Sequence, residues 1–233
     1  MVALADNNLV HLVEVRGGKP GQTLTGHQSA ISSLCLSQDG TMAVSSDHQT
    51  IKVWDTETGA ELHQFPAEGT SIQAVAISPD EDVVLSVQGS VDSTISAWDL
   101  SSNSLKYTIP SDHWSTITTL HCARSGTLFL TSSADHTVNI RHLASGQLRM
   151  TMEGHGDAVN SATFSGDTSK VLTGSEDRTV AVWDTESGQL ETLLEGCTDG
   201  VKVVAFLPSD KKVLGCLSDG TVYIWDLGLG HSR

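Results

Sequence analysis

Apolar and polar residues alternate along most of the chain in short runs that are separated by polar turns. Four segments open with apolar residues at offsets zero, three and five, which are Ile31, Leu34 and Leu36; Ile72, Val75 and Ile77; Val159, Ala162 and Phe164; and Val201, Val204 and Phe206. Each opening run is followed by a turn and then by a second β-rich run. A tight polar turn leads to a third run with a period of two, and a further hairpin leads to a fourth amphipathic run. This pattern predicts four antiparallel strands per segment, and no window has a helical period.

The segments are repeats with a period of about 40–45 residues. A tryptophan position recurs in phase at Val13, Trp54, Trp98, Arg141, Trp183 and Trp225, and aspartate follows it at Asp55, Asp99, Asp184 and Asp226. Upstream, a histidine position is held by His27, Glu68, His113, His155 and Cys197, and a turn position by Asn7, His48, Asp92, Asp135, Asp177 and Asp219. One Trp-Asp pair would be a weak signal, whereas four in phase with Gly-His pairs are a strong one.

These marks resemble the WD40 repeat family, whose repeat forms one blade of a β-propeller. The resemblance runs from about Asp6 to Leu227 and implies an all-β fold. We predict one propeller domain over residues 1–233, with four complete four-stranded blades that start near residues 27, 68, 113 and 155. A partial blade at 1–26, an incomplete last blade at 197–226 and a tail at 227–233 complete the assignment.

The partial blade matches the second, third and fourth strands of a repeat, and the Gly-rich stretch 17–21 is expected to be a hairpin loop inside it. A propeller with an open blade at each end exposes apolar faces and unpaired edges. The economical interpretation is a fragment of a longer propeller. The alternatives are six blades with one partly formed, or completion by another chain.

The repeat that ends at Trp183 also contains His155, Ser175 and Asp177, a set that would fit a hydrolase triad. The same residue types recur in other repeats, whereas a triad is needed only once. The WD40 resemblance implies a structural role instead. In it, Asp177 bonds His155, and a Ser or Thr of the second strand, with Ser175 as the candidate, bridges to the indole of Trp183.

The other repeats keep parts of this network: His27, Ser46 and Trp54, with Asp47 one place early; Ser90, Asp92 and Trp98, with Glu68 for histidine; His113, Ser133 and Asp135, with Arg141 for tryptophan; and Asp219 and Trp225, with Cys197 for histidine. One complete network in five predicts uneven stability. We expect the Asp177→Ala substitution to cost more stability than Asp92→Ala.

Charge and composition exclude several classes of function. The chain has 13 Lys and Arg against 28 Asp and Glu, a net charge of −15, which argues against nucleic acid or an anionic membrane as partner. Its most acidic quarter is either a solvated surface or a docking patch for a basic partner. The four cysteines have no Cys-x-x-Cys spacing, and no signal peptide is present, so we expect a cytoplasmic or nuclear protein that is not secreted.

No His or Cys cluster has metal-ligand spacing, and no glycine-rich loop has the phosphate-binding form, so no metal, cofactor or small-molecule substrate is predicted. Trp114 fits no structural position and is either packed at an edge or an exposed anchor. The face that WD40 proteins use for partners would here carry Trp114, Thr116, Asp157, Glu176, Arg178, Asp199 and Lys202.

The predicted function is a non-catalytic protein–protein interaction scaffold that binds other proteins or peptides. The alternative is a sensor segment of a larger protein that resembles the WD-repeat tails of NACHT-type signalling NTPases. An enzyme in its own right would need a singular cluster of chemical groups, which the repeats do not offer.

Overall fold

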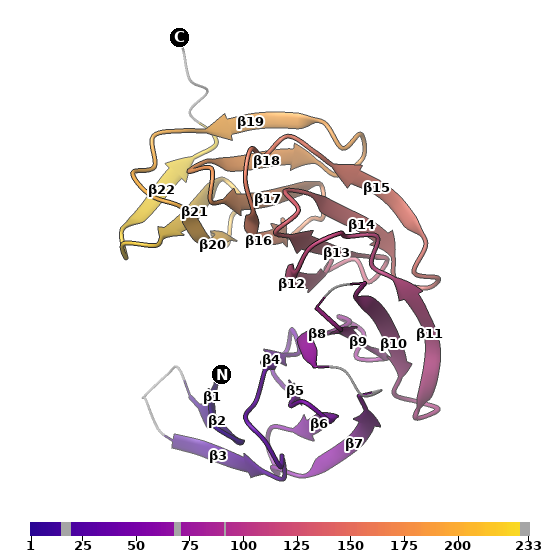
Figure 1. Cartoon of the computed structure of the whole chain (residues 1–233). Helices are drawn as coiled ribbons and strands as arrows, with labels where there is room; N and C mark the ends of the chain where they lie inside the picture. The colour runs from indigo at the N-terminus through magenta and orange to yellow at the C-terminus, as the bar shows by residue number, and fades with distance from the viewer. Residues whose placement is uncertain (15–19, 68–70, 91, 229–233) are drawn as a thin grey trace. The chain divides into compact units, whose positions relative to one another are not determined.

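A computed structural model describes residues 1–14, 20–67, 71–90 and 92–228 (Figure 1). The described residues form strands, turns and loops, with no helix among them, and therefore none that could cross a membrane. Contacts group the chain into two units, Met1–Asp112 and His113–Arg233. The predicted loop at 17–21 and the residue Glu68 fall wholly or largely outside the described residues, as does most of the predicted tail.

The first unit contains three antiparallel sheets in chain order. Their strands are β1 (Val2–Asp6), β2 (Leu9–Val13) and β3 (Pro20–Thr25); β4 (Ser33–Leu36), β5 (Met42–Ser46), β6 (Thr50–Asp55) and β7 (Glu61–Pro66); and β8 (Ile72–Ile77), β9 (Val83–Gln88), β10 (Thr94–Asp99) and β11 (Ser104–Pro110). The first sheet has three strands and the other two have four.

The second unit also contains three antiparallel sheets. Their strands are β12 (Ile117–Cys122), β13 (Leu128–Ser133), β14 (Val138–His142) and β15 (Leu148–Met152); β16 (Val159–Phe164), β17 (Lys170–Ser175), β18 (Val180–Asp184) and β19 (Leu190–Leu194); and β20 (Val201–Phe206), β21 (Lys212–Leu217) and β22 (Val222–Asp226). The prediction of an all-β chain with four complete four-stranded blades and a partial blade at each end is confirmed.

The apolar spacing in the first strand of each repeat has a structural cause. In β16 the register against β17 shifts between Val159 and Ser161, and in β20 it shifts between Val201 and Val203. Such a β-bulge inserts one residue into the strand. Residues at offsets zero and three therefore share one face, where a regular strand would place offsets zero and two.

The first apolar residue of the second sheet's pattern precedes its first strand. The first strand of the second sheet begins at Ser33 and not at Ile31, and the backbone N–H of Ile31 instead donates to the carbonyl of Asn7, 2.7 Å away. Ile31 still packs against the cluster around Trp54. The residue therefore belongs to the core but lies outside the strand ladder.

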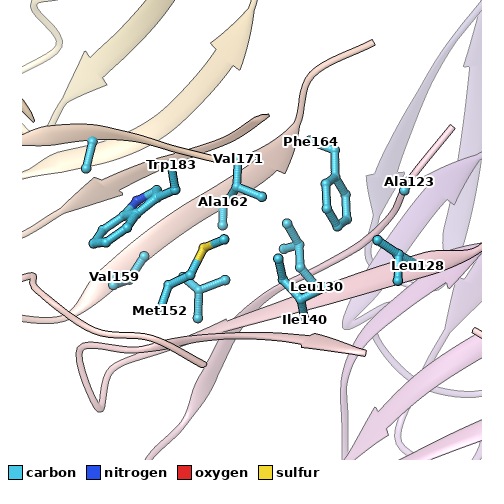
Figure 2. Close-up of a cluster of buried hydrophobic side chains, with 12 residues drawn as sticks. Ala123, Leu128, Leu130, Ile140, Met152, Val159, Ala162, Phe164, Val171 and Trp183 are labelled. Carbon is cyan, nitrogen blue, oxygen red and sulfur yellow. The ribbon is translucent and has the colours of Figure 1, made fainter. Parts of the chain in front are cut away.

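Hydrophobic clusters join neighbouring sheets within each unit. In the second unit, Leu130, Ile140 and Met152 of one sheet face Val171 and Trp183 of the next (Figure 2). All five side chains are at most 3% exposed. Burial of this size supplies the main favourable term for holding one sheet on another.

The aspartate after each tryptophan shapes the next hairpin. Asp184 Oδ1 accepts from the backbone N–H and the hydroxyl of Ser187, at 2.7 and 2.6 Å. Asp55 makes the same pair of bonds with Thr58. These bonds lower the pKa of both carboxyls. The Trp-Asp signature therefore includes a turn-forming residue as well as a core residue.

Candidate protein-interaction surface

The predicted polar network lies beneath the surface loops and fixes their base. Asp177 Oδ2 is 2.8 Å from His155 Nδ1, and His155 Nε2 is 2.7 Å from the hydroxyl of Thr173. That hydroxyl accepts the indole N–H of Trp183 at 2.9 Å. Because an ionised carboxylate can only accept, Nδ1 must carry the proton, and Nε2 then accepts the hydroxyl proton of Thr173.

The bridging residue is Thr173, and the expectation that Ser175 fills this place is wrong. Ser175 lies two residues further on and donates its hydroxyl to the carbonyl of Asp157 at 3.0 Å. It also accepts the backbone N–H of Asp177 at 3.1 Å. Ser175 therefore closes the tight turn, while Thr173 connects the histidine to the tryptophan.

A second complete network occurs in the repeat of Trp54, so the prediction of a single complete network is wrong. The bridging hydroxyl is Ser45, which is 2.7 Å from His27 Nε2 and 2.8 Å from Trp54 Nε1. The acid is Asp47, whose Oδ2 is 3.2 Å from His27 Nδ1. Ser46, which was the predicted hydroxyl, instead contacts the Ser32 hydroxyl at 3.1 Å.

The third full repeat keeps the network without its tryptophan. His113 Nδ1 is 2.8 Å from Asp135, and its Nε2 is 2.9 Å from the Thr131 hydroxyl, again two residues before the predicted Ser133. Arg141 occupies the tryptophan position at 3% exposure and donates to the carbonyl of Gly146 at 2.9 Å. A buried guanidinium thus replaces the indole.

The two remaining repeats have reduced networks. Trp98 donates to the Ser86 hydroxyl at 3.1 Å, whereas Asp92 is exposed and adopts a left-handed conformation with φ of 53°. In the last repeat, Asp219 is exposed and accepts the backbone N–H of Thr221 at 2.8 Å. Trp225 is half-buried there, and a Cβ on Gly215 would lie 2.9 Å from its ring.

Strand pairing, and not distance along the chain, determines which residue bridges. Trp183 pairs with Val171 and Trp54 pairs with Ala43, and the bridging Thr173 and Ser45 each lie two residues beyond that partner. The same offset of two residues holds in the other repeats. There it leads from Val84 to Ser86, from Phe129 to Thr131 and from Val213 to Gly215. The last repeat therefore has glycine where the others have a hydroxyl.

The acids of the networks are held in their charged form. Burial alone would raise the pKa of Asp177 and Asp135. Hydrogen bonds from Thr179 and His155 outweigh this effect at Asp177, so its pKa is lowered. Thr137 and His113 lower the pKa of Asp135 in the same way. Desolvation lowers the pKa of His27 in spite of its neighbour Asp47.

Although an Asp-His-Thr series has the connectivity of a hydrolytic triad, its surroundings oppose catalysis. The hydroxyl of Thr173 is buried, with 0% exposure of the residue, and already accepts from Trp183. A nucleophile must reach its substrate and lose its proton to the histidine. A hydroxyl that is covered on every side and bonded to an indole fits a structural role.

The loops above these networks carry a set of exposed and half-buried side chains within the second unit. Trp114 is 74% exposed, so the alternative of edge packing is wrong. Its ring centroid lies 6.3 Å from that of His136, and His136 Nε2 is 3.9 Å from Asp157 Oδ1. We call the surface formed by Trp114, Thr116, His136, Asp157, Glu176, Arg178, Asp199 and Lys202 the loop surface.

The loop surface continues over the next two repeats. The backbone N–H of Glu176 donates to the carbonyl of Ala158 at 2.9 Å, which ties it to the loop of Asp157. The carboxylate of Glu176 pairs with Lys202. A Cβ on Gly200 would lie 1.6 Å from a Glu176 carboxylate oxygen, so this carboxylate occupies the space that only glycine leaves there.

These contacts connect Trp114, Asp157, Glu176 and Lys202 of the predicted partner-binding residues and add one residue that the sequence did not indicate. Thr116, Asp157, Arg178, Asp199 and Lys202 are exposed and Glu176 is half-buried. The addition is His136, which lies in the turn position between Asp135 and Thr137 and adopts φ of 74°. Arg178 holds the equivalent position in the next repeat, with φ of 69°.

Within the described ranges, no group of three or more His, Cys, Asp or Glu residues is arranged to hold a metal ion. Cys35, Cys197 and Cys216 are free, and Cys197 is buried, where desolvation raises the pKa of its thiol. The loop surface offers an aromatic ring, Trp114, and charges of both signs.

Comparison with known proteins matches the repeats one by one. The model of the WD domain, G-beta repeat, matches residues 18–55, 59–99, 103–141, 146–184 and 188–226. The chain is 28% identical over 168 residues to Mitochondrial division protein 1 of Eremothecium gossypii, covering 61% of this chain and 23% of that protein. It is 25% identical over 163 residues to Autophagy-related protein 16 of Arabidopsis thaliana, covering 69% and 31%.

A third relative is the Guanine nucleotide-binding protein subunit beta of Nicotiana tabacum, which is 30% identical over 171 residues, covering 68% of this chain and 45% of that protein. The chain thus spans less than half the length of each of these three relatives.

Proposed function

The chain belongs to the WD40 repeat family, and on that premise we propose that it is a non-catalytic scaffold that binds other proteins or peptides through the loop surface. The family match and the WD-repeat relatives support an interaction role. The buried state of the polar networks supports the absence of catalysis in this chain. Function in a repeat fold of this kind lies in exposed loops that differ between repeats.

The observation that carries the proposal is the exposure of Trp114. A tryptophan that is 74% exposed leaves a large apolar ring in water, next to His136 and within a surface of charged residues. Tryptophan and arginine are enriched at the energetic centres of protein interfaces. Trp114 would be the anchor, and Arg178 and the Glu176–Lys202 pair would select the partner.

The proposed partner is a basic protein or peptide segment. The chain has a net charge of −15, and its loop surface carries Asp157 and Asp199 in exposed positions. Opposite charge accelerates encounter and disfavours acidic competitors. Nucleic acid and anionic membranes would be repelled by the same charge.

A cross-linking pull-down with the Trp114→Ala, Glu176→Lys double variant tests the proposal. Proteins retained by the wild-type chain should be lost, because the variant removes the anchor and reverses one charge. Leu62→Ala is the matched control, since Leu62 is 43% exposed on β7 in the first unit. An unchanged set of retained proteins in the double variant would refute the assignment of this surface.

A second proposal is that the chain is the sensor segment of a larger signalling protein of the NACHT type. Its basis is the resemblance of these repeats to the WD-repeat tails of such proteins. The parent reading frame distinguishes the two, because a phosphate-binding loop upstream is required only by the sensor. We further propose a cytoplasmic location, in keeping with the free thiols of Cys35, Cys197 and Cys216.

A further inference from the structure

A cavity of about 220 Å³ lies among the first strands of the three sheets of the second unit. Its walls come from the C-terminal ends of β12, β16 and β20 and from the loops that follow these strands. Because β16 contacts both β12 and β20, the walls belong to one unit. Trp114, Asp157 and Asp199 of the loop surface precede the same strands, so the cavity lies at the opposite end of them.

The cavity contains one cation, the guanidinium of Arg124 in the loop after β12. Arg124 is exposed, and none of the acidic residues in the described ranges forms an ion pair with it, although the chain has 28 Asp and Glu against 13 Lys and Arg. A guanidinium offers N–H donors in a planar fork that matches a carboxylate. Arg124 is therefore available to an acidic group of a ligand.

His121 adds an uncharged donor to the same cavity. The backbone N–H of Phe164 donates to His121 Nδ1 at 3.4 Å, and burial, together with the charge of Arg124, lowers the pKa of His121 to about 4. The imidazole is thus neutral at pH 7 and carries its proton on Nε2. No acceptor for this proton occurs in the part of the chain that the structure describes, so it can be donated to a ligand.

The negative charge in the cavity is the carboxylate of Asp210, in the loop after β20. Its Oδ2 accepts the backbone N–H of Gly166 at 2.9 Å, which holds it against the loop of the preceding sheet. A Cβ on Gly166 would lie 2.9 Å from that oxygen, so the carboxylate occupies the space of a side chain at this position. Asp210 and Arg124 line one cavity and form no ion pair with each other, which leaves both for a ligand.

The remaining walls are largely apolar and limit the size of the ligand. Phe206 and Leu207 are half-buried, so an apolar group in the cavity could cover them further. A cavity of about 150 Å³ holds one benzene molecule, and about 220 Å³ therefore fits a single amino acid. Phosphates and nucleotides would be repelled by Asp210, and a simple amine by Arg124. A ligand with one acid group and a separate N–H donor meets neither repulsion.

We propose that this cavity binds an apolar α-amino acid, either free or as the C-terminal residue of a peptide. The α-carboxylate bonds to Arg124 and His121, the side chain covers Phe206, and the amino or amide N–H donates to Asp210. Both sources carry these three groups on one carbon atom, which is the chemistry that the cavity recognises. The site is separate from the loop surface, so its failure would leave the proposed scaffold function untouched.

A ¹H–¹⁵N NMR titration of the whole chain with three small probes tests the proposal. L-leucine represents the free amino acid, N-acetyl-L-leucine the end of a peptide, and L-leucinamide lacks the carboxylate. At least one of the two acids should shift the amide signals of Phe164 and Gly166 in a saturable way, and L-leucinamide should not. Tighter binding of L-leucine identifies the free amino acid as the ligand, and tighter binding of N-acetyl-L-leucine identifies the peptide end.

Arg124→Gln should weaken binding of the acids at least about tenfold, because a charge-assisted hydrogen bond is lost. Lys106→Gln is the matched control, since it removes one positive charge from an exposed side chain on β11 in the first unit and should bind like the wild type. Asp210→Asn can still accept from Gly166, and it should weaken binding of L-leucine more than that of N-acetyl-L-leucine.

Circular dichroism should show that these variants remain folded, because Arg124 and Lys106 are exposed and Asn keeps the shape of Asp210. The proposal is overturned if neither acid gives saturable shifts, or if L-leucinamide binds as well as the acids do. It is also overturned if a folded Arg124→Gln variant binds them with the affinity of the wild type.

Discussion

The hydroxyl oxygen of Thr173 lies 2.9 Å from the indole nitrogen of Trp183 and 2.7 Å from His155 Nε2, so one side chain joins two others that come from different strands and loops. The Asp177 carboxylate holds the far side of the histidine. Loop, turn and core strand are therefore linked through Thr173, and the loop surface rests on that link.

Replacing Thr173 with valine should destabilise the chain by about 1–3 kcal/mol, because the shape is kept while the buried indole N–H and imidazole nitrogen lose their partner. Ser86→Ala should cost less, since Ser86 accepts from Trp98 and its repeat has no equivalent bonded histidine among the described residues. Urea unfolding of both variants measures the difference. Equal losses would contradict the role of the shared hydroxyl.

Asp177→Ala should cost about 1–3 kcal/mol by unpairing buried donors, whereas Asp92→Ala should change stability by less than about 0.5 kcal/mol. Asp177 accepts from Thr179, Gly156 and His155, while Asp92 is exposed. The denaturation midpoints of the two variants provide the check. If they coincide, the network does not carry the stability assigned to it.

Acidification should destabilise the chain in two stages. Burial, followed by the charge of Arg124, lowers the pKa of His121 to about 4. Because the folded pKa lies below the unfolded value of about 6.5, the stabilisation is complete above pH 6.5 and is lost as the pH falls toward 4. Asp135 and Asp177, whose pKa values are also lowered, should add a second loss below about pH 4.

His121→Asn should flatten the first stage, as followed by unfolding free energy against pH. The exposed His48 is the control position, and His48→Asn should retain the slope of the wild type. If the free energy of unfolding of His121→Asn falls as steeply between pH 6.5 and 4 as that of the wild type, other titrating groups cause the first stage.

Gly174→Ala should destabilise the second unit by about 1–3 kcal/mol through overpacking. The new Cβ would lie 2.6 Å from methyl groups of both Val201 and Val204, which are themselves at most 5% exposed. Gly156→Ala is the control, because its Cβ would meet Asp177 at an ordinary 3.8 Å. Thermal unfolding should separate the two variants, and equal melting temperatures would show that the sheets can move apart at little cost.

Gly200→Ala should alter partner binding with little effect on stability. The added Cβ must displace the carboxylate of Glu176, which is the far end of a flexible side chain, and so break its pair with Lys202. An exposed ion pair contributes about 1 kcal/mol or less to stability. Binding of a cross-linked partner, compared with that of Gly156→Ala, measures the effect, and unaltered retention would place the contact elsewhere.

The fold could be predicted from sequence because each repeat carries several independent marks at a constant spacing. The bridging hydroxyls could not be assigned by position in the turn. Trp54 and Ser45 are nine residues apart, Trp183 and Thr173 ten, and Trp98 and Ser86 twelve. Only the strand register, which places each hydroxyl two residues beyond the partner of the tryptophan, identifies them.

The loop surface was predictable only in part for a related reason. Trp114 is recognisable because it matches no repeating position, whereas His136 occupies an ordinary turn position and is distinguished only by its contact with Trp114. Exposure depends on neighbours from other repeats, which a single repeat does not specify. Glu68, the expected substitute for histidine, lies outside the described residues.

The variable separation between each tryptophan and its hydroxyl has a consequence for how such a chain can diversify. Residues can be added to or removed from the hairpin between them while the hydroxyl still reaches the indole. Insertions in the hairpin between Ser86 and Trp98, whose Asp92 is exposed, would lengthen a recognition segment without breaking a His–Asp bond, whereas the hairpins after Ser45 and Thr173 carry Asp47 and Asp177 of the networks. Grafting foreign sequences into the hairpin between Ser86 and Trp98, already the longest of the three, is therefore a practical route to new binding specificities.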